Sequence, residues 1–479
     1  MAGTIDAVGV FRDTVLRSPR RRAATVAAAV VFVLVATAVQ LWRVSGEYVW
    51  RTVWFEDAAV FYRDALDQPL TETFAKPYNG YAHVLPRILA TVGSWLPPEW
   101  YSAWAAVSSA FVVSLLALFL YFASTPLLRA PLRRGILAAS LLVLPVLSLE
   151  VLGALCNLQW MLVIPCLFAV LFPVDGWGGI AVRAVIGVVA PLTSPLCLLF
   201  APFALYQLVM FVRRSDQWRR FVVPVLYLAA CVGQLILYLG AEHHPLRGAV
   251  HPPLGDVLDD IADLYTVGVL IYGGLDAELS SELWRSSSSW LGWVAAVVVS
   301  VLLLVKLRRA ESTARLWIAG FALASPVVFA FTMVQRPERV VLALSLLPRD
   351  MRYWVVPQFL MLIALLVPPA VDRGLLVGSS QGAGMGFSAT NTSVRGGGAL
   401  AGGLPWVSLS MLTVAWLGLA VAPSYRHDVD RSNFPSWPDE VADAQAACRV
   451  DPTEPQIIEV SPPDWQLQMT CVELDAGDP

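Results

Sequence analysis

Residues 23–42 read AATVAAAVVFVLVATAVQLW, a predominantly apolar stretch that carries no charged side chain. A helix of about 20 apolar residues crosses the hydrocarbon core of a bilayer. The basic side chains before it mark its cytoplasmic end by the positive-inside rule: Arg17, Arg20, Arg21 and Arg22. We therefore expect residues 1–22 to be a cytoplasmic N-terminus, followed by an uncleaved span that ends outside.

Composition extends this interpretation to most of the chain. The 479 residues are 57% hydrophobic and 14% charged, and long apolar runs alternate with arginine clusters. Within lipid, only helices and closed barrels satisfy their backbone hydrogen bonds, and these runs are too long for barrel strands. The sequence thus predicts an all-α polytopic protein of the lipid bilayer, and it lacks the basic footprint of a nucleic-acid-binding protein.

The placement of Lys and Arg predicts about eleven spans in a membrane domain at 23–422, with the N-terminus inside and the C-terminus outside. A break at 191–195 should turn the chain on the outer side. The connections include a first outer loop at 43–103, a long outer loop at 241–289 and a flexible, Gly/Ser-rich cytoplasmic loop at 374–403. The expected spans are 23–42, 104–122, 136–155, 158–172, 180–190, 196–212, 221–240, 290–305, 316–334, 354–367 and 406–421.

The polar tail at 423–479 differs in composition from the membrane domain. It combines a helix-like piece at 439–447 with a strand-like piece at 457–460, which predicts a small extracytoplasmic α/β tail. Cys448 and Cys471 are its two cysteines, and an oxidising compartment favours a disulfide between them. The other four cysteines lie in apolar runs, as buried small hydrophobes do.

An acidic pair, Glu56-Asp57, follows the first span. A carboxylate just outside the membrane can act as general base for a lipid-borne substrate when its neighbours set its protonation state. The plainer alternative is a solvated pair of loop residues.

The same loop continues with Tyr78-Asn79-Gly80-Tyr81-Ala82-His83-Val84-Leu85-Pro86-Arg87. Aromatic rings stack on sugars, and amide, imidazole and guanidinium groups orient hydroxyls or a phosphate. These side chains are therefore candidate substrate contacts: Tyr78, Asn79, His83 and Arg87. An interfacial aromatic belt with a snorkelling arginine is the alternative.

Two further polar groups are expected on the outer side. Asn157, Gln159 and Trp160, with Glu150, lie where the third and fourth spans meet and could line a site or form a hydrogen-bond clamp. A basic cluster before the tenth span departs from the positive-inside trend, which favours an anionic phosphate partner over pairing with Glu338, Asp350 and the tail. Its members are Arg336, Arg339, Arg349, Arg352 and the neighbouring Tyr353.

The long outer loop also carries histidines and acids at irregular spacing, which matches no known metal-ligand pattern, and solvated loop residues are the better interpretation. They are His243, His244, His251, Asp256, Asp259 and Asp260. We expect no metal site there.

Together, the acids of the first outer loop, the polytopic bundle and the Arg-Tyr pair before a late span resemble the GT-C fold of integral membrane glycosyltransferases, over most of residues 23–372. Within that superfamily the chain is most similar to uncharacterised bacterial proteins with an Asn-Gly-Tyr-X-His…Pro-Arg stretch, an Asn-X-X-Trp site and an outer tail with two cysteines. Its Ala-, Val- and Arg-rich style resembles that of actinobacterial proteins.

The resemblance implies an inverting hexosyl- or pentosyltransferase of cell wall biogenesis. It would move one sugar from a polyprenyl-phosphate donor to a glycan, lipid or protein acceptor on the outer face of the cytoplasmic membrane. Asp57 or Glu56 would be the general base, and Arg352 would neutralise the departing phosphate. The superfamily varies in its acidic pair and in its use of a divalent cation, so the base and any cation dependence stay open.

Two other classes compete with this interpretation. A transporter or lipid flippase would also have a broken helix, but it should carry ionisable residues near the bilayer midplane, where this sequence has few. A noncatalytic envelope-assembly protein that presents its tail would not depend on the acidic pair.

Overall fold

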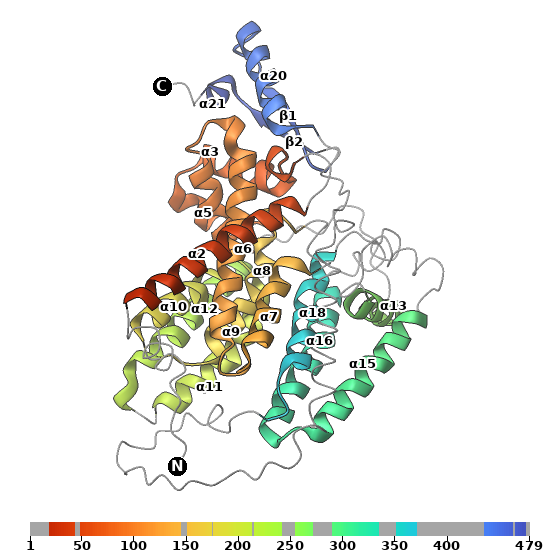
Figure 1. The fold of residues 1–479 in the computed structure, drawn as a ribbon. Coiled ribbons are helices and arrows are strands. Elements are labelled where there is room, and N and C mark those ends of the chain that lie inside the picture. The colour runs from red at the N-terminus through yellow and green to blue at the C-terminus, as the bar shows by residue number, and fades with distance from the viewer. Residues whose placement is uncertain are drawn as a thin grey trace.

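The computed structural model is mostly helical, with a small C-terminal unit at one end of a helical body (Figure 1). The residues that it describes are 19–43, 48–144, 151–174, 176–212, 215–241, 254–271, 290–334, 351–370, 435–462 and 465–475.

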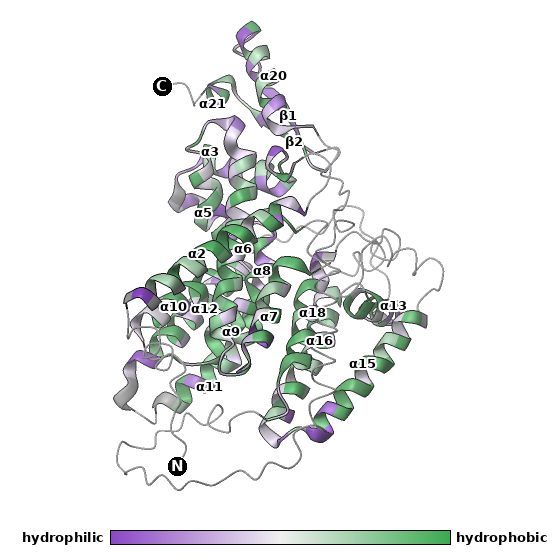
Figure 2. Cartoon of the chain, in the orientation of Figure 1, coloured by the Kyte–Doolittle hydropathy of each residue, from purple (hydrophilic) through white to green (hydrophobic). Residues whose placement is uncertain are grey.

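Five helical segments in this part of the chain are long and apolar enough to cross a membrane: Ala23–Trp42, Pro98–Ala123, Trp218–Gly240, Trp290–Arg309 and Ser312–Val334. They correspond to helices α2 (Pro19–Trp42), α6 (Tyr101–Ala123), α12 (Val222–Gly240), α15 (Trp290–Arg309) and α16 (Ser312–Val334). Figure 2 shows that hydrophobic residues predominate along these helices. Many of their large apolar side chains are exposed: Val297 is 62% exposed and Leu323 is 67% exposed. Apolar surface of this extent is what a lipid environment requires.

Several shorter helices complete the body: α3 (Arg63–Asp67), α4 (Leu70–Ala75), α5 (Val84–Gly93), α7 (Pro131–Val143), α8 (Leu158–Met161), α9 (Val163–Leu171), α10 (Trp177–Val189), α11 (Ala201–Val212), α13 (Leu254–Leu264) and α18 (Val355–Leu366). The core of the body forms around α9, every residue of which is buried. A helix that is apolar on all sides belongs in such an interior.

The expected count of about eleven spans is not confirmed, and the segment 136–155 shows one reason. Its helix ends at Val143, and residues 151–153 form a turn instead of continuing the span. Arg43 stabilises this end, because its guanidinium donates to the carbonyl oxygens of Leu142 at 2.8 Å and Leu144 at 3.1 Å. The expected last span, 406–421, lies outside the described residues.

Close packing of α2 on α6 shows how the apolar helices associate. Small residues such as Ala106 and Ala110 let the two backbones approach. Gln40 then donates to the Ala110 carbonyl and to the Ser114 hydroxyl, both at 2.9 Å, while Thr37 contacts the same hydroxyl. Polar groups that would be costly in lipid are thereby satisfied between helices.

The C-terminal unit consists of α20 (Trp437–Val450), an antiparallel pair of strands β1 (Gln456–Val460) and β2 (Trp465–Met469), and α21 (Cys471–Leu474). A disulfide joins Cys448 in α20 to Cys471 at the start of α21. The unit lies against α3 and the first loop (Figure 1), and it shares an apolar core with that loop through side chains such as Tyr62, Tyr101 and Trp437.

Candidate functional site

The acidic pair begins a π-helix, Glu56–Tyr62, which continues directly into α3. Wide helical turns of this kind are rare and often occur at functional sites. Acidic side chains in a first helical turn are also favoured by the helix dipole. The backbone before the pair is held from outside, since Phe55 donates to the Ser461 carbonyl at 2.7 Å and Ser461 donates to the Val53 carbonyl at 3.0 Å.

Asp57 is fully buried, and its carboxylate is held by hydrogen bonds. Its two carboxylate oxygens accept hydrogen bonds from the backbone N–H groups of Leu155 and Cys156, each at 2.8 Å. Its own carbonyl accepts a hydrogen bond from the Tyr101 hydroxyl at 2.6 Å. Asp57 therefore ties the π-helix to the turn that precedes α8.

Glu56 has a different environment. Its side chain is half-buried, and within the described part of the chain its carboxylate makes no hydrogen bond. Of two acids that are adjacent in sequence, only Glu56 thus has an accessible carboxylate.

The pKa of Tyr78 reflects the charges around its hydroxyl, one of which is on Glu56. Burial raises the pKa of the Tyr78 hydroxyl to about 12, and the Glu56 carboxylate contributes to this rise, whereas Asn79 and Arg352 oppose it. An acid from the first loop and an arginine from the segment before α18 therefore act on the same phenol.

Cys156 gives the same information from a second position. Burial raises the pKa of its thiol well above the ordinary value, and the carboxylates of Asp57 and Glu56 raise it further. Arg352 again acts in the opposite direction. The acidic pair and Arg352, almost 300 residues apart in sequence, thus both act electrostatically on the thiol in the turn before α8.

Two aromatic residues extend this group. The rings of Trp160 and Tyr353 meet edge to face with centroids 5.1 Å apart. Trp160 is buried, and its indole N–H has no hydrogen-bond partner among the described residues. Asn157 is buried in the same turn and Gln159 is half-buried.

The Asn79-Gly80 dipeptide forms a tight turn in the first loop. Both residues have positive φ, 51° and 81°, and Tyr78 and Tyr81 exchange backbone hydrogen bonds at 2.9 and 3.0 Å. Asn-Gly is the preferred pair for a two-residue turn of this geometry. The turn leaves the Asn79 side chain exposed beside Tyr78.

His83 is fully buried with a left-handed φ of 47°. Its ring lies 5.3 Å from that of Phe61, 5.8 Å from Tyr78 and 5.5 Å from Tyr81, measured between centroids. Burial, followed by the charge of Arg87, lowers its pKa to about 3, so the imidazole is neutral at physiological pH. The Tyr78 backbone offsets part of this shift, but neither ring nitrogen has a partner with hydrogen-bond geometry in the described residues.

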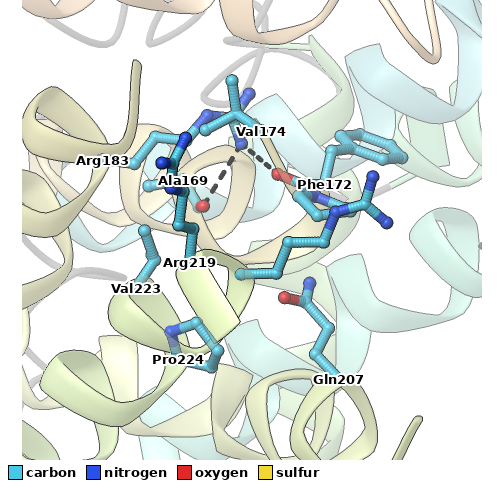
Figure 3. Close-up of a pocket in the computed structure, with 10 residues that line it drawn as sticks. Ala169, Phe172, Val174, Arg183, Gln207, Arg219, Val223 and Pro224 are labelled. Atoms are coloured by element: carbon cyan, nitrogen blue, oxygen red, sulfur yellow. Dashed lines mark hydrogen bonds between the residues drawn. The ribbon is translucent and has the colours of Figure 1, made fainter. Parts of the chain in front are cut away.

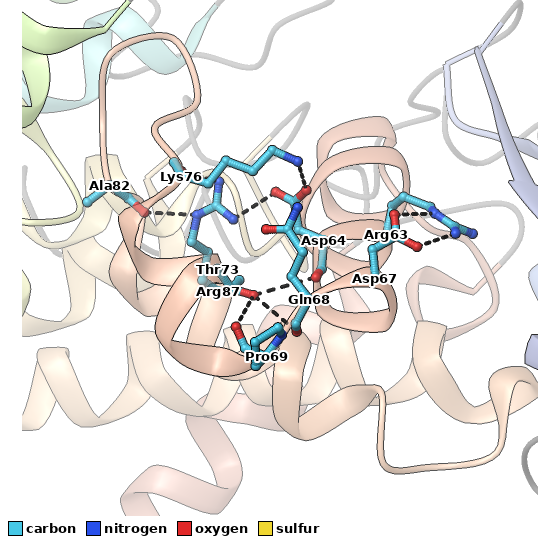
Figure 4. Close-up of polar contacts among 9 residues, drawn as sticks. All are labelled: Arg63, Asp64, Asp67, Gln68, Pro69, Thr73, Lys76, Ala82 and Arg87. Atoms are coloured by element: carbon cyan, nitrogen blue, oxygen red, sulfur yellow. Dashed lines mark hydrogen bonds and ion pairs between the residues drawn. The ribbon is translucent and has the colours of Figure 1, made fainter.

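Arg87 holds the loop together and has no exposed surface with which to contact a substrate. Figure 4 shows its guanidinium between the Asp64 carboxylate at 2.8 Å, the Ala82 carbonyl at 3.0 Å and the Lys76 carbonyl at 2.7 Å. Asp64 also pairs with the Lys76 ammonium. The substrate contact that its position in the sequence suggests is therefore replaced by a structural one.

The loop is also anchored on helices far away in sequence. Gln234 of α12 accepts from the Ala82 N–H at 3.3 Å and donates to the Gly80 carbonyl at 3.1 Å. At the helix break, the Thr193 hydroxyl accepts from the Leu85 N–H at 3.2 Å. Sequence analysis did not single out Gln234 or Asp64, although a lone amide in an apolar helix is a usable signal.

Arg349 and its neighbours lie outside the described residues, as do Glu150, Arg336, Arg339 and the three histidines of the long outer loop. Arg352 is half-buried in a short helix, Met351–Trp354, directly before α18. Among the described residues no group of three or more His, Cys, Asp or Glu side chains could hold a metal ion. Whether the reaction uses a divalent cation stays open.

Comparison with known proteins adds no family to this description, since no family model, curated protein or solved structure shows significant similarity to the chain. Geometry and chemistry are therefore the basis for assigning a function.

Proposed function

We propose that the protein is an integral membrane glycosyltransferase of the GT-C type. It transfers one sugar from a polyprenyl-phosphate donor to an acceptor hydroxyl of a cell-envelope glycan, lipid or protein. The positive-inside rule supports a site on the outer face of the cytoplasmic membrane, with the N-terminus inside and the tail outside. The observation that carries the proposal is that the turn before α8 joins distant segments: Asp57 binds its N–H groups, and the ring of Tyr353, next to Arg352, meets that of Trp160 at 5.1 Å. The charges of Glu56 and Arg352 also act on the same Tyr78 hydroxyl.

The reaction needs a base and a cation on the two sides of one anomeric carbon. Glu56 accepts the proton of the acceptor hydroxyl while the oxygen of that hydroxyl forms a bond to the anomeric carbon. The bond from the carbon to the phosphate oxygen breaks, and its electron pair leaves with the polyprenyl phosphate. Arg352 neutralises this charge through its planar, bidentate fork.

Asp57 has a positioning role in this proposal. Because its carboxylate is bound to the N–H groups of Leu155 and Cys156, it aligns the π-helix that begins at Glu56 with the turn before α8. Tyr78 and Tyr353, which are half-buried, supply aromatic surface on which a sugar ring can stack, and the buried Trp160 packs against Tyr353.

The test is sugar transfer by purified protein from a panel of synthetic polyprenyl-phosphate sugars. Glu56→Gln keeps the size of the side chain but removes its basicity, so its rate should fall about 10²–10⁴-fold. The matched control is Glu72→Gln, which removes an exposed acid of the same loop and should leave the rate unchanged. Full activity of a Glu56→Gln/Asp57→Asn double variant would contradict the proposal.

Arg352 is tested in the same assay. Arg352→Ala should weaken donor binding and lower kcat/KM by at least about tenfold, since charge-assisted hydrogen bonds to a phosphate contribute about 1.5–3 kcal/mol. Arg352→Lys keeps the charge but not the bidentate guanidinium, so its kcat/KM should lie between those of wild type and Arg352→Ala. Equal activity of wild type and Arg352→Ala would remove Arg352 from the site.

A further inference from the structure

The outward face of α5 is apolar and is only partly covered by the rest of the protein. Val84, Ile88 and Val92 follow one another at the spacing of a helical turn, and all three are half-buried. Residues 84–96 contain one charged side chain, Arg87, and it is buried. An uncharged, partly exposed helix face of this kind favours an apolar surrounding over water.

The turn after α5 continues this apolar surface. Trp95 is 74% exposed, and Trp100, which directly precedes α6, is 60% exposed. Within α6, Val107 and Phe111 follow Trp100 at helical spacing and are also exposed. Exposed tryptophan is typical of the membrane–water interface, and exposed apolar side chains on a spanning helix face lipid. The lipid-facing surface of α6 therefore continues onto this turn.

Both ends of α5 are attached to membrane helices. At its start, the Val84 N–H donates to the Leu192 carbonyl at 3.3 Å, in the break after α10. At its end, a Cβ added to Gly93 would lie 2.6 Å from the ring of Trp104 in α6, and the Trp104 indole donates to the Leu89 carbonyl at 2.7 Å. The break and the start of α6 are both outer ends by the positive-inside rule. A helix that joins two points on one side of a membrane domain runs along the membrane plane.

The depth of α5 follows from α12. Arg219 lies just before this helix, near Val223 (Figure 3), and its guanidinium is 5.1 Å from the centre of the exposed Trp177 ring, so this end lies at the cytoplasmic interface. Gln234 of α12 donates to the Gly80 carbonyl, in the turn before α5. Gln234 follows Arg219 by fifteen residues, or roughly 22 Å along a helix, whereas the hydrocarbon core is about 30 Å thick. The turn before α5 therefore falls within the outer leaflet instead of above it.

We propose that α5 and the turn after it bind the outer leaflet of the bilayer, with the axis of α5 along the membrane plane. Val84, Ile88 and Val92 contact acyl chains, while Trp95 and Trp100 lie at the level of the lipid headgroups. This part of the first outer loop is thus embedded in lipid instead of projecting into water. The placement is separate from the proposed transfer reaction and does not depend on it.

Spin labels on single-cysteine variants of the full chain in phosphatidylglycerol/phosphatidylcholine nanodiscs test this proposal. The probes are Val84→Cys, Val92→Cys and Leu96→Cys. Phe111→Cys, in α6, is the control within the bilayer, and Ile457→Cys, at a 60% exposed apolar position of β1, is the control in water. Collision rates of each label with O2 and with a water-soluble nickel chelate give its depth. Wild-type protein, labelled in parallel, gives the background from the buried free cysteines.

The three probe labels should lie about 5–10 Å into the boundary between headgroups and acyl chains, shallower than Phe111→Cys and less accessible to the chelate than Ile457→Cys. Val84→Cys and Val92→Cys should reach similar depths, because an upright helix would separate them by roughly 12 Å. A separation of that size would overturn the in-plane helix. Chelate access at Val92→Cys and Leu96→Cys equal to that at Ile457→Cys would overturn the lipid contact. Shielding of these two labels from both O2 and the chelate would show that protein covers the face, which would also overturn the proposal.

Discussion

Glu56 and Asp57 are adjacent acids with different surroundings, and their amide variants should therefore fail in different ways. In Asp57→Asn one of the N–H groups of Leu155 and Cys156 loses its acceptor oxygen, which should lower the free energy of unfolding by about 1–3 kcal/mol. Glu56→Gln breaks no hydrogen bond in the described structure and should leave stability unchanged. Thermal unfolding in detergent measures both, and equal destabilisation by the two variants would contradict the distinction.

His83 predicts a pH dependence of stability with a definite sign. Its folded pKa of about 3 lies below the value of about 6.5 in an unfolded chain, so the unfolded state binds a proton more readily between these values. The stability contribution is complete above pH 6.5 and falls as the pH drops toward 3, by about 2 kcal/mol at pH 5.

The variant that tests this is His83→Asn, because asparagine tolerates the left-handed φ at this position and does not titrate. Chemical denaturation at pH 7.5 and pH 5 should show a larger loss for wild type than for the variant. The same loss in both proteins would assign the pH dependence to other groups.

At the scale of elements, the first outer loop depends on one buried ion pair. Asp64→Asn leaves the Arg87 guanidinium buried without its counter-charge, which should cost about 3–5 kcal/mol of stability. Asp67→Asn is the control, because Asp67 forms an exposed pair with Arg63 and should contribute no more than about 1 kcal/mol. Thermal unfolding compares the two, and hydrogen exchange over residues 76–87 locates the change. Similar effects of both variants would refute the structural role of Arg87.

At the scale of the whole molecule, the C-terminal unit supports the segment that carries the acidic pair. Trp437 donates to the Pro98 carbonyl at 2.8 Å, and the ring centroids of Phe55 and Trp465 are 3.7 Å apart. Together with the backbone hydrogen bonds between Ser461 and residues Val53 and Phe55, these contacts hold the chain segment that directly precedes Glu56. A tail that is remote in sequence thus packs beside the candidate site.

Removal of the disulfide should therefore loosen the backbone around the acidic pair. In Cys448→Ser/Cys471→Ser the unit loses a crosslink that closes a loop of 23 residues, for which the chain-entropy model gives about 3 kcal/mol. Hydrogen exchange in residues 53–58 should rise, while exchange in the buried helix α9 stays constant and serves as the internal control. Unchanged exchange at 53–58 would separate the tail from the site.

Much of the architecture follows from local sequence, because hydrophobicity and turn preference act over short distances. The charge-free run at 23–42 determines a membrane helix, and Asn79-Gly80 determines a tight turn. The span count does not follow in this way, since the helix that starts at Pro131 ends at Val143 despite the apolar residues beyond it. Its end is set in part by Arg43, which is distant in sequence.

Only the tertiary structure decides which polar side chains are accessible. Glu56 and Asp57 are equivalent in a local reading, yet the turn at Leu155 and Cys156 binds one and leaves the other half-exposed. Arg87 reads as a substrate contact until Asp64 is placed beside it. The physical reason is that burial and hydrogen-bond partners depend on contacts between residues far apart in the chain, whereas the free energy of placing a segment in lipid is a sum over that segment alone.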